Sequence, residues 1–265
     1  MSLPALITTL HDPQGKTLPF LERDAVVSAL TSYAMVVVAA TLATDARVTT
    51  RLEQLGARVV PGGLTGVGRH AALAAFSEAA AYFNCDLDRW LHWVICWPEE
   101  LAALPERVRR LGPGERARPW CVCLGRTARA FRTHPAVQRL PEAATNRALS
   151  LAAGRTLDAV SGAVWLSPEG REIVLAESRE SSASTDLEWA ALILRRDPAR
   201  LRGLRCEGLE WETPDVHAAE IADAGGLAPW TRAAFDTPTM WAARLRLAAD
   251  STAALERVLR GPRSA

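Results

Sequence analysis

Apolar residues along the first half of the chain alternate between short continuous runs and longer stretches with helical spacing. Residues 35–41 form a continuous run of small and β-branched residues, which is typical of a parallel strand covered on both faces. Residues 18–32 place apolar side chains at the spacing of an amphipathic helix. The helix expected next covers residues 46–55, with Thr44-Asp45 as its cap and Gly56 ending it. Successive strand–helix units of this kind indicate an α/β protein with a largely parallel sheet.

The same pattern continues, less regularly, through the second half. Strands are expected over residues 3–10, 35–41, 58–61, 83–88, 120–124 and 204–211, with a further buried strand within 158–167. Helices are expected over residues 18–32, 46–55, 69–81, 98–110, 141–153, 167–178 and 185–196, followed by a mostly helical remainder. Residues 91–97 fit either a helix or a strand.

Composition narrows the class of protein. The 265 residues are 49% hydrophobic and carry a formal net charge of +1, which indicates a globular chain without the charge of a nucleic-acid binder. No apolar run approaches the length of a membrane span, and no charged leader precedes the first apolar residues, so we expect a cytoplasmic protein. The five cysteines include no Cys-x-x-Cys pair and lie mostly in apolar runs, which favours buried reduced thiols over a zinc site.

Two aspartates, Asp86 and Asp88, flank Leu87 at the end of the strand expected over residues 83–88. In an extended turn, a spacing of one residue lets both carboxylates point to one side, where they can bind Mg²⁺ or Mn²⁺. Such a cation can hold a diphosphate and neutralise charge on a departing nucleoside diphosphate. The alternative is a solvated turn in which Asp88 pairs with Arg89.

Polar residues also follow the first two expected strands. His11, Asp12 and Pro13 lie at the carboxyl end of the first strand, where open α/β sheets place their ligands. This position favours contact with a nucleotide, although Asp12 before Pro13 also fits an Asx turn. Asp45 follows the second strand, and it can either contact a nucleoside or cap the next helix.

A glycine-rich segment, residues 62–68, leads into the helix expected over 69–81. The backbone N–H groups at Gly66 and Gly68 can bind phosphate at the helix N-terminus, with Arg69 as a cationic partner. A flexible crossover loop explains the same glycines equally well. Their spacing does not match the dinucleotide fingerprint.

Asp186 and Glu188 lie just after a serine-rich stretch, residues 178–184, and at the start of an expected helix. A carboxylate beside a sugar site can take the proton of an acceptor hydroxyl, and Asp186 is preferred because it is nearer the loop. In the alternative interpretation Thr185 caps the helix, and the two acidic residues interact with its amino-terminal dipole.

The order of these features resembles the GT-A class of nucleotide-diphospho-sugar glycosyltransferases over roughly residues 3 to 200. The residues that carry the resemblance are His11-Asp12-Pro13, Thr44-Asp45, the glycine loop before Arg69, Asp86-Leu87-Asp88-Arg89, Gly162-Ala163-Val164-Trp165-Leu166-Ser167 and Thr185-Asp186-Leu187-Glu188-Trp189. The resemblance implies a three-layer α/β/α sandwich with a mostly parallel, mixed central sheet. It further implies a single domain over residues 1–265, with a nucleotide-sugar-binding half at 1–125 and an acceptor-binding half at 126–265.

The resemblance also implies roles for individual residues. The nucleotide-binding residues that it suggests are Thr9, His11, Asp12, Pro13, Asp45, Gly66, Gly68 and Arg69. Asp86 and Asp88 correspond to the motif that binds Mg²⁺ or Mn²⁺, and some GT-A enzymes add a histidine from their carboxyl-terminal part, here His217. A lone histidine is more often structural. Asp186 and Glu188 are the residues that correspond to a catalytic base.

We therefore expect a metal-dependent glycosyltransferase that moves a hexosyl group from a nucleotide-diphosphate sugar to an unknown acceptor. One alternative is a sugar-1-phosphate nucleotidyltransferase, for which residues 12–16 form only a weak version of the basic loop required. The other is a non-catalytic relative that binds a sugar nucleotide.

Overall fold

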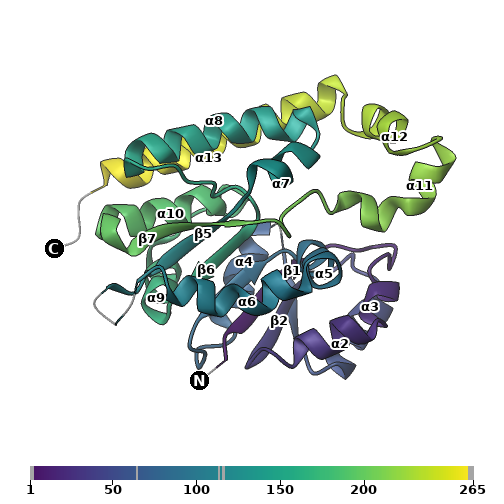
Figure 1. The fold of residues 1–265 in the computed structure, drawn as a ribbon, viewed down its shortest axis with the longest axis horizontal. Coiled ribbons are helices and arrows are strands. Elements are labelled where there is room, and N and C mark those ends of the chain that lie inside the picture. Colours follow the sequence, from purple (N-terminus) through teal and green to yellow (C-terminus); the bar gives the residue numbers. More distant parts are fainter. Residues whose placement is uncertain (1–2, 64, 113, 115–116, 262–265) are drawn as a thin grey trace.

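The structure is a computed structural model that describes residues 3–63, 65–112, 114 and 117–261. The strands of these residues form one seven-stranded sheet in the order β3-β2-β1-β4-β6-β5-β7 (Figure 1). The strands are β1 (Ala5–Leu10), β2 (Met35–Thr41), β3 (Arg58–Gly62), β4 (Tyr82–Cys85), β5 (Cys121–Arg126), β6 (Ala163–Leu166) and β7 (Leu201–Cys206). Only β6 runs antiparallel to its neighbours, β4 and β5. The sheet is therefore mixed and mostly parallel, as the sequence predicts.

Helices cover both faces of the sheet. One face packs against α1 (Leu18–Leu21), α2 (Asp24–Leu30), α3 (Ala46–Gln54), α5 (Leu87–Cys96) and α6 (Pro98–Arg109). The other face packs against α4 (Thr65–Ala74), α8 (Ala136–Ala153), α9 (Pro168–Glu177), α10 (Thr185–Arg196) and α13 (Pro238–Arg260). Shorter segments are α7 (Ala128–Thr133), η2 (Pro198–Arg200), η3 (Thr213–His217), α11 (Ala218–Asp223) and α12 (Leu227–Ala234). Figure 1 shows α8 and α13 side by side and α11 and α12 projecting beyond the sheet.

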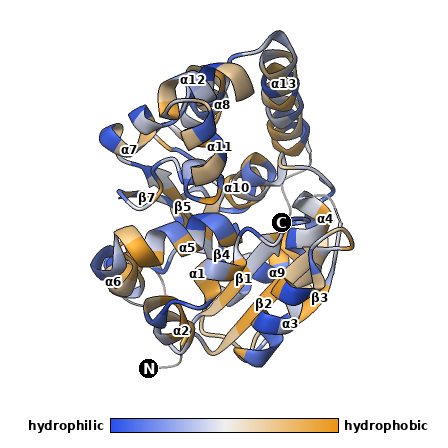
Figure 2. Cartoon of the chain, turned by 90° about the vertical axis from the view of Figure 1, so that its right-hand side faces the viewer, coloured by the Kyte–Doolittle hydropathy of each residue, from blue (hydrophilic) through white to orange (hydrophobic). Residues whose placement is uncertain are grey.

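The alternation of side chains along each strand divides the core into two clusters. In β4, Phe83 and Cys85 face the helices on the α5 side, while Tyr82 faces those on the α10 side. Phe83 packs between the rings of Trp93 and Trp165, whose centroids lie 5.9 and 6.0 Å away. Because both faces of the strands are buried, the sequence of the central strands is nearly all apolar. Figure 2 shows this hydrophobic centre, with hydrophilic residues on the surrounding helices.

The cysteines largely follow the sequence prediction. Cys121 and Cys123 alternate along β5 and lie on the same face of the sheet. Cys85 and Cys206 are also buried, and all five thiols are free, but Cys96 is exposed because it ends α5 on the outer side of the helix. The expectation of buried thiols is wrong for that residue.

Several element boundaries differ from those expected. Residues 91–96 are helical, because they belong to α5, and Trp97 is the C-cap residue of that helix. The strand expected over 204–211 is β7, which ends at Cys206 because the backbone N–H groups of the next two residues turn to the Glu100 carboxylate. Residues 75–81 leave α4, where Arg171 donates to the carbonyl groups at the helix end.

None of the helices among the described residues is long and apolar enough to cross a membrane.

A tight contact between α9 and Trp120, the residue before β5, generates a testable prediction. A Cβ atom at Gly170 lies 2.0 Å from the backbone carbonyl oxygen of Trp120. Gly170→Ala should therefore destabilise the fold by about 2–3 kcal/mol in urea unfolding, more than the gain in helix propensity of about 1 kcal/mol. Glu172→Ala, at an exposed position of the same helix, should change stability by less than about 0.5 kcal/mol. Equal midpoints for the two variants contradict this packing.

Candidate functional site

The carboxyl ends of β1 and β4 meet the turn before β6, and this junction gathers three residues from distant parts of the sequence. The parallel register pairs Ile7 with Asn84, so Thr9 lies level with Asp86 and donates a 2.9 Å hydrogen bond to its carboxylate. The antiparallel register pairs Cys85 with Ala163, which brings Gly162 next to Asp86. Gly162 has a φ of +75°, and a Cβ atom there lies 2.9 Å from Asp86 Oδ2. Strand register therefore positions Asp86.

The two aspartates lie at the start of a helix, and the extended turn expected from the sequence is wrong. Asp86 is the N-cap residue of α5 and Asp88 lies in its first turn. The alternative of an Asp88–Arg89 ion pair is also wrong, because the Arg89 guanidinium donates to Glu212, at 2.6 Å, and to the carbonyl oxygen of Ser161. Only the backbone N–H of Arg89 reaches Asp88, at 2.8 Å. The Asp88 carboxylate is otherwise without a partner among the described residues.

Arg69 from α4 lies between two carboxylates and is only 2% exposed. Its guanidinium donates at 3.2 Å to both oxygens of Asp86, and it also donates to Asp186 at the start of α10. The Thr185 hydroxyl accepts a further bond from it at 3.1 Å. Residues that the sequence assigns to phosphate binding, to the metal and to catalysis are thus joined in one buried ion-pair network.

The two carboxylates proposed for catalysis are in different surroundings. Burial raises the pKa of Asp186 to about 6, although the Arg69 charge opposes this shift. Glu188 is 1% exposed and pairs with Arg257 at 2.9 Å. Its oxygens accept hydrogen bonds from the Ser178 hydroxyl and from the backbone N–H groups of Arg179 and Glu180, so Glu188 stabilises the segment before α10.

Two cavities meet at Asp86 and Asp88. The strand-end cavity, of about 420 Å³, is lined by residues after β1, including His11, Asp12 and Lys16, and by η3. The helix-roofed cavity, of about 340 Å³, lies under α8 and α13 and is lined by Asp186. Both are lined by Thr65, Asp86, Asp88 and Thr213. A molecule in either cavity reaches the same pair of carboxylates.

The predicted residues after the first strands have clear local roles. Asp12 lines the strand-end cavity and orders the loop after β1 by accepting bonds from Lys16 N at 2.9 Å and from Thr17 N at 2.8 Å. These bonds reach four and five residues along the chain, farther than the two residues that an Asx turn spans. Burial alone raises the pKa of Asp12, but these hydrogen bonds outweigh it and lower the pKa below its ordinary value. His11 and Pro13 line the same cavity. Asp45 caps α3 through the backbone N–H of Arg47 at 2.8 Å.

The glycines before Arg69 serve close packing. A Cβ atom at Gly66 lies 2.5 Å from the backbone of Ser181, and one at Gly68 lies 3.2 Å from the methyl group of Thr9. The segment that precedes α10 therefore covers the first turn of α4, which begins at Thr65 instead of the predicted residue 69. Leu64 lies outside the described residues.

A divalent cation is compatible with the chemistry of Asp86 and Asp88. Burial, together with Glu212 and Asp86, raises the pKa of Asp88 to about 7, and a neighbouring cation would favour the ionised form of this carboxyl. No group of three His, Cys, Asp or Glu side chains suited to a metal occurs among the described residues. Mg²⁺ commonly binds one or two carboxylates plus substrate phosphates and water, so two aspartates fit a cation that is completed by a diphosphate.

His217, the third metal ligand suggested from the sequence, lines the strand-end cavity but is held elsewhere. Its Nδ1 atom lies 3.2 Å from Lys16 Nζ and 3.3 Å from Glu220 Oε1. Lys16 also forms an ion pair with Glu220. These contacts join the loop after β1 to α11, on the far side of the cavity.

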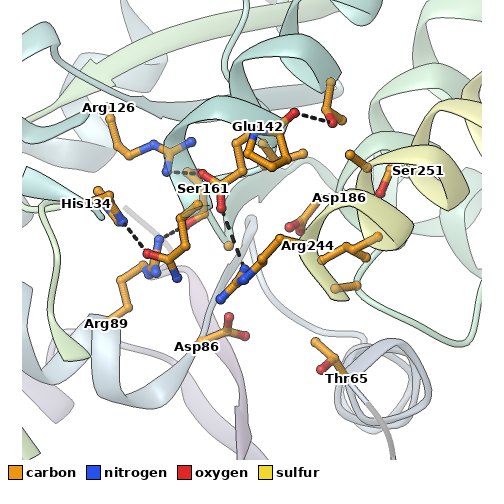
Figure 3. A pocket seen from close by; sticks show the side chains of 18 of the residues that line it. Thr65, Asp86, Arg89, Arg126, His134, Glu142, Ser161, Asp186, Arg244 and Ser251 are labelled. Atoms are coloured by element: carbon orange, nitrogen blue, oxygen red, sulfur yellow. Dashed lines mark hydrogen bonds and ion pairs between the residues drawn. The ribbon is translucent and has the colours of Figure 1, made fainter. Parts of the chain in front are cut away.

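The helix-roofed cavity contains charged residues that the sequence pattern does not indicate. Arg126 is 2% exposed and pairs with Asp158 at 2.9 Å and with Glu142 at 2.6 Å. Arg244 reaches into the cavity from α13 between Asp86 and Glu142 (Figure 3). Burial, assisted by the charges of Arg126 and Arg89, lowers the pKa of His134 to about 4, so this histidine is neutral at pH 7.

Comparisons place this architecture among known folds. No model of a protein family matches the chain, and no curated protein matches its sequence. Glucosyl-3-phosphoglycerate synthase from Mycobacterium tuberculosis, in complex with uridine diphosphate, matches with a TM-score of 0.60 and 16% identity over 95% of this chain and 80% of that chain. The same protein in complex with Mn²⁺, uridine diphosphate and glucosyl-3-phosphoglycerate matches with a TM-score of 0.53 and 17% identity, over 77% of this chain and 70% of that chain.

A third complex of that synthase, with Mn²⁺, uridine-diphosphate-glucose and glycerol 3-phosphate, gives a TM-score of 0.51 and 16% identity. It covers 77% of this chain and 70% of that chain. At this identity the likeness concerns the fold. The chain has the α/β fold of a GT-A glycosyltransferase, which confirms the fold expected from the order of its motifs.

Proposed function

We propose that the protein is a cation-dependent glycosyltransferase that moves a hexosyl group from a nucleotide-diphosphate sugar to a hydroxyl of an acceptor. The observation that carries the proposal is the meeting of two cavities at Asp86 and Asp88. One cavity lies at strand ends, where α/β sheets bind nucleotides, and the other lies beneath the carboxyl-terminal helices. Two molecules placed in them come together at the aspartates, as a transfer reaction requires.

The strand-end cavity takes the donor in this proposal. Its walls come mostly from residues 1–125, and the loop after β1 is held by hydrogen bonds from Lys16 N and Thr17 N to the Asp12 carboxylate. His11 and Lys16 offer N–H donors at its rim. The similar synthase has been solved with uridine diphosphate and with uridine-diphosphate-glucose, so a uridine donor is the first to test.

In the proposed site, Asp86 and Asp88 hold Mg²⁺ or Mn²⁺. Such a cation supplies charge neutralisation for the diphosphate. Arg69 fixes the orientation of Asp86, and Thr9 fixes one of its oxygens. His217 lines the same cavity, and it becomes a ligand only if it leaves its contacts with Lys16 and Glu220.

In the transfer step, an oxygen of the acceptor hydroxyl bonds to the anomeric carbon of the hexosyl group. The bond from that carbon to the diphosphate oxygen breaks, and its electron pair leaves with the nucleoside diphosphate. Asp186 receives the proton of the hydroxyl, since it lines the acceptor side and its pKa of about 6 suits a base near neutral pH. Glu188 holds the loop before α10 and contacts neither cavity.

One observation favours a second candidate, a non-catalytic protein that binds a sugar nucleotide. Arg69 pairs with Asp186, and this contact opposes proton transfer to that carboxylate. A nucleotidyltransferase has less support, because Lys16, the basic residue of the loop after β1, pairs with Glu220. Release of uridine diphosphate from uridine-diphosphate-glucose separates the transferase from both.

The cation site can be tested by removing the carboxylate that lacks a side-chain partner. Asp88→Asn should weaken binding of uridine diphosphate in the presence of Mn²⁺ at least tenfold, by roughly 1.4 kcal/mol or more in binding free energy. Calorimetric titrations with Mn²⁺ and with EDTA measure this effect. Asp250→Asn, at an exposed position of α13, is the control and should bind as the unaltered protein does. Binding that is indifferent to EDTA and to Asp88→Asn would falsify the proposed site.

The space that Gly162 leaves beside Asp86 gives a second test. Gly162→Ala adds a Cβ atom 2.9 Å from Asp86 Oδ2, so the carboxylate must move and cation-dependent binding should weaken at least fivefold. Gly154→Ala is a matched control, because its φ is also positive, at +65°, but a Cβ atom meets nothing within 4 Å. Each variant should lose about 1–2 kcal/mol of stability from the left-handed backbone. If both bind uridine diphosphate and Mn²⁺ alike, the contact with Asp86 does not matter for the site.

The pH dependence of transfer tests the role of Asp186. A base acts in its ionised form, and with a pKa of about 6 this carboxylate is mostly protonated below pH 6. The value of kcat/KM should therefore fall about tenfold per pH unit below pH 6 and level off above it. Asp186→Asn should lower the rate at pH 7.5 by a factor of about 10²–10⁴ and abolish the fall in kcat/KM below pH 6. Glu188→Gln should retain the fall in kcat/KM below pH 6. If Glu188→Gln abolishes this fall and Asp186→Asn retains it, the base is Glu188.

A further inference from the structure

Besides Arg69, three arginines from three elements line the helix-roofed cavity, and they differ in their partners. Arg89 from α5 pairs with Glu212 at 2.6 Å, and Arg126 from β5 pairs with Asp158 and Glu142. These short contacts satisfy the charge of both guanidinium groups. The third arginine, Arg244 from α13, lacks such a short contact.

Among the described residues, the guanidinium of Arg244 makes no hydrogen bond. Its one ion pair, with Glu142 Oε1, is long, at 3.8 Å. The other oxygen of that carboxylate is already held by Arg126 at 2.6 Å. The Arg244 side chain is 27% exposed, so its N–H donors remain accessible from the cavity.

The surroundings of Arg244 disfavour its positive charge. Burial, assisted by repulsion from Arg89, lowers the pKa of Arg244 below its ordinary value, despite the opposing charges of Glu142 and Glu212. An anionic group of a ligand restores the balance, and a guanidinium fork suits the two oxygens of a carboxylate or phosphate.

The helix geometry directs this side chain to the cavity. Arg244, Leu247, Ala248 and Ser251 all line the cavity, and their spacing of three, four and seven residues puts them on one face of α13. Ser251 also contacts Ser184 at 3.2 Å, which fixes that face toward α10. Arg244 lines the helix-roofed cavity and is absent from the walls of the strand-end cavity.

We propose that Arg244 is a specificity-determining residue that binds a carboxylate or phosphate group on the acceptor. This inference rests on the proposed function, because it assigns the helix-roofed cavity to the acceptor. A small hydroxyl compound held by its anionic group at Arg244 extends through the cavity toward Asp186 and the two aspartates after β4.

The test is calorimetric titration of inorganic phosphate and of D-glycerate into the protein saturated with uridine diphosphate and Mn²⁺. Both anions should bind, and Arg244→Gln should weaken their affinity at least fivefold. Arg244→Lys should give an intermediate loss, since it keeps the charge without the fork. Arg246→Gln is the matched control, because this residue is an exposed arginine on the same helix, and it should leave affinity unchanged. Glycerol, which has the hydroxyls without the charge, should bind at least fivefold more weakly than D-glycerate.

The outcomes separate the two proposals. If the unaltered protein and Arg244→Gln bind phosphate and D-glycerate equally, or if glycerol binds as well as D-glycerate, the inference is overturned. A fivefold loss of affinity for uridine diphosphate in Arg244→Gln overturns it also, because the arginine then serves the donor. If uridine diphosphate does not bind at all, the proposed function fails, and titration of phosphate into the protein alone still reports whether Arg244 binds an anion.

Discussion

The buried guanidinium of Arg69 is the contact on which the centre of the molecule depends. It joins Asp86, which follows β4, to Asp186, which begins α10, and these carboxylates come from the two halves of the chain. Removing one partner from a buried ion pair typically costs about 3–5 kcal/mol, because the remaining charge stays out of water. Gly66 permits this arrangement, since the backbone of Ser181 packs directly on it. The same network leaves the Asp88 side chain outside its ion pairs among the described residues, and burial raises the pKa of that carboxyl.

Much of the fold follows from local patterns in the sequence. The apolar run at β2 and the cap residues Asp45 and Gly56 around α3 predict both elements nearly to the residue, because burial of a strand on both faces and the capping of helix ends are local signals. Boundaries are predicted less well where distant side chains decide them. Glu100 ends β7 by binding backbone N–H groups after Cys206, and Arg171 binds the carbonyl groups that end α4. Contacts between residues so far apart leave no mark in a single sequence.

The candidate site was predictable only in part. Asp86, Asp88 and His11 lie at strand ends, so their order along the chain brings them together in any sheet of this topology. Arg69 illustrates the limit: its position beside a glycine loop suggests a phosphate ligand, whereas its side chain turns inward to two carboxylates. Arg126 and Arg244 were missed because polar residues on helices and strand ends usually belong to solvated surfaces. The nucleotide, the cation and the cytoplasmic location stay predictions.

The helix α13 has two different tasks along its length. Near its carboxyl end, Leu255 and Val258 are buried in the core, and near its amino end Arg244 and Leu247 line a cavity. Arg244 and Leu255 lie about 16 Å apart along the axis at a rise of ~1.5 Å per residue. A stiff rod anchored at one end transmits a small tilt to the other, so altered packing around Leu255 shifts the ceiling over Asp186 without touching it. Core composition in the last helix is thereby coupled to the width of the helix-roofed cavity.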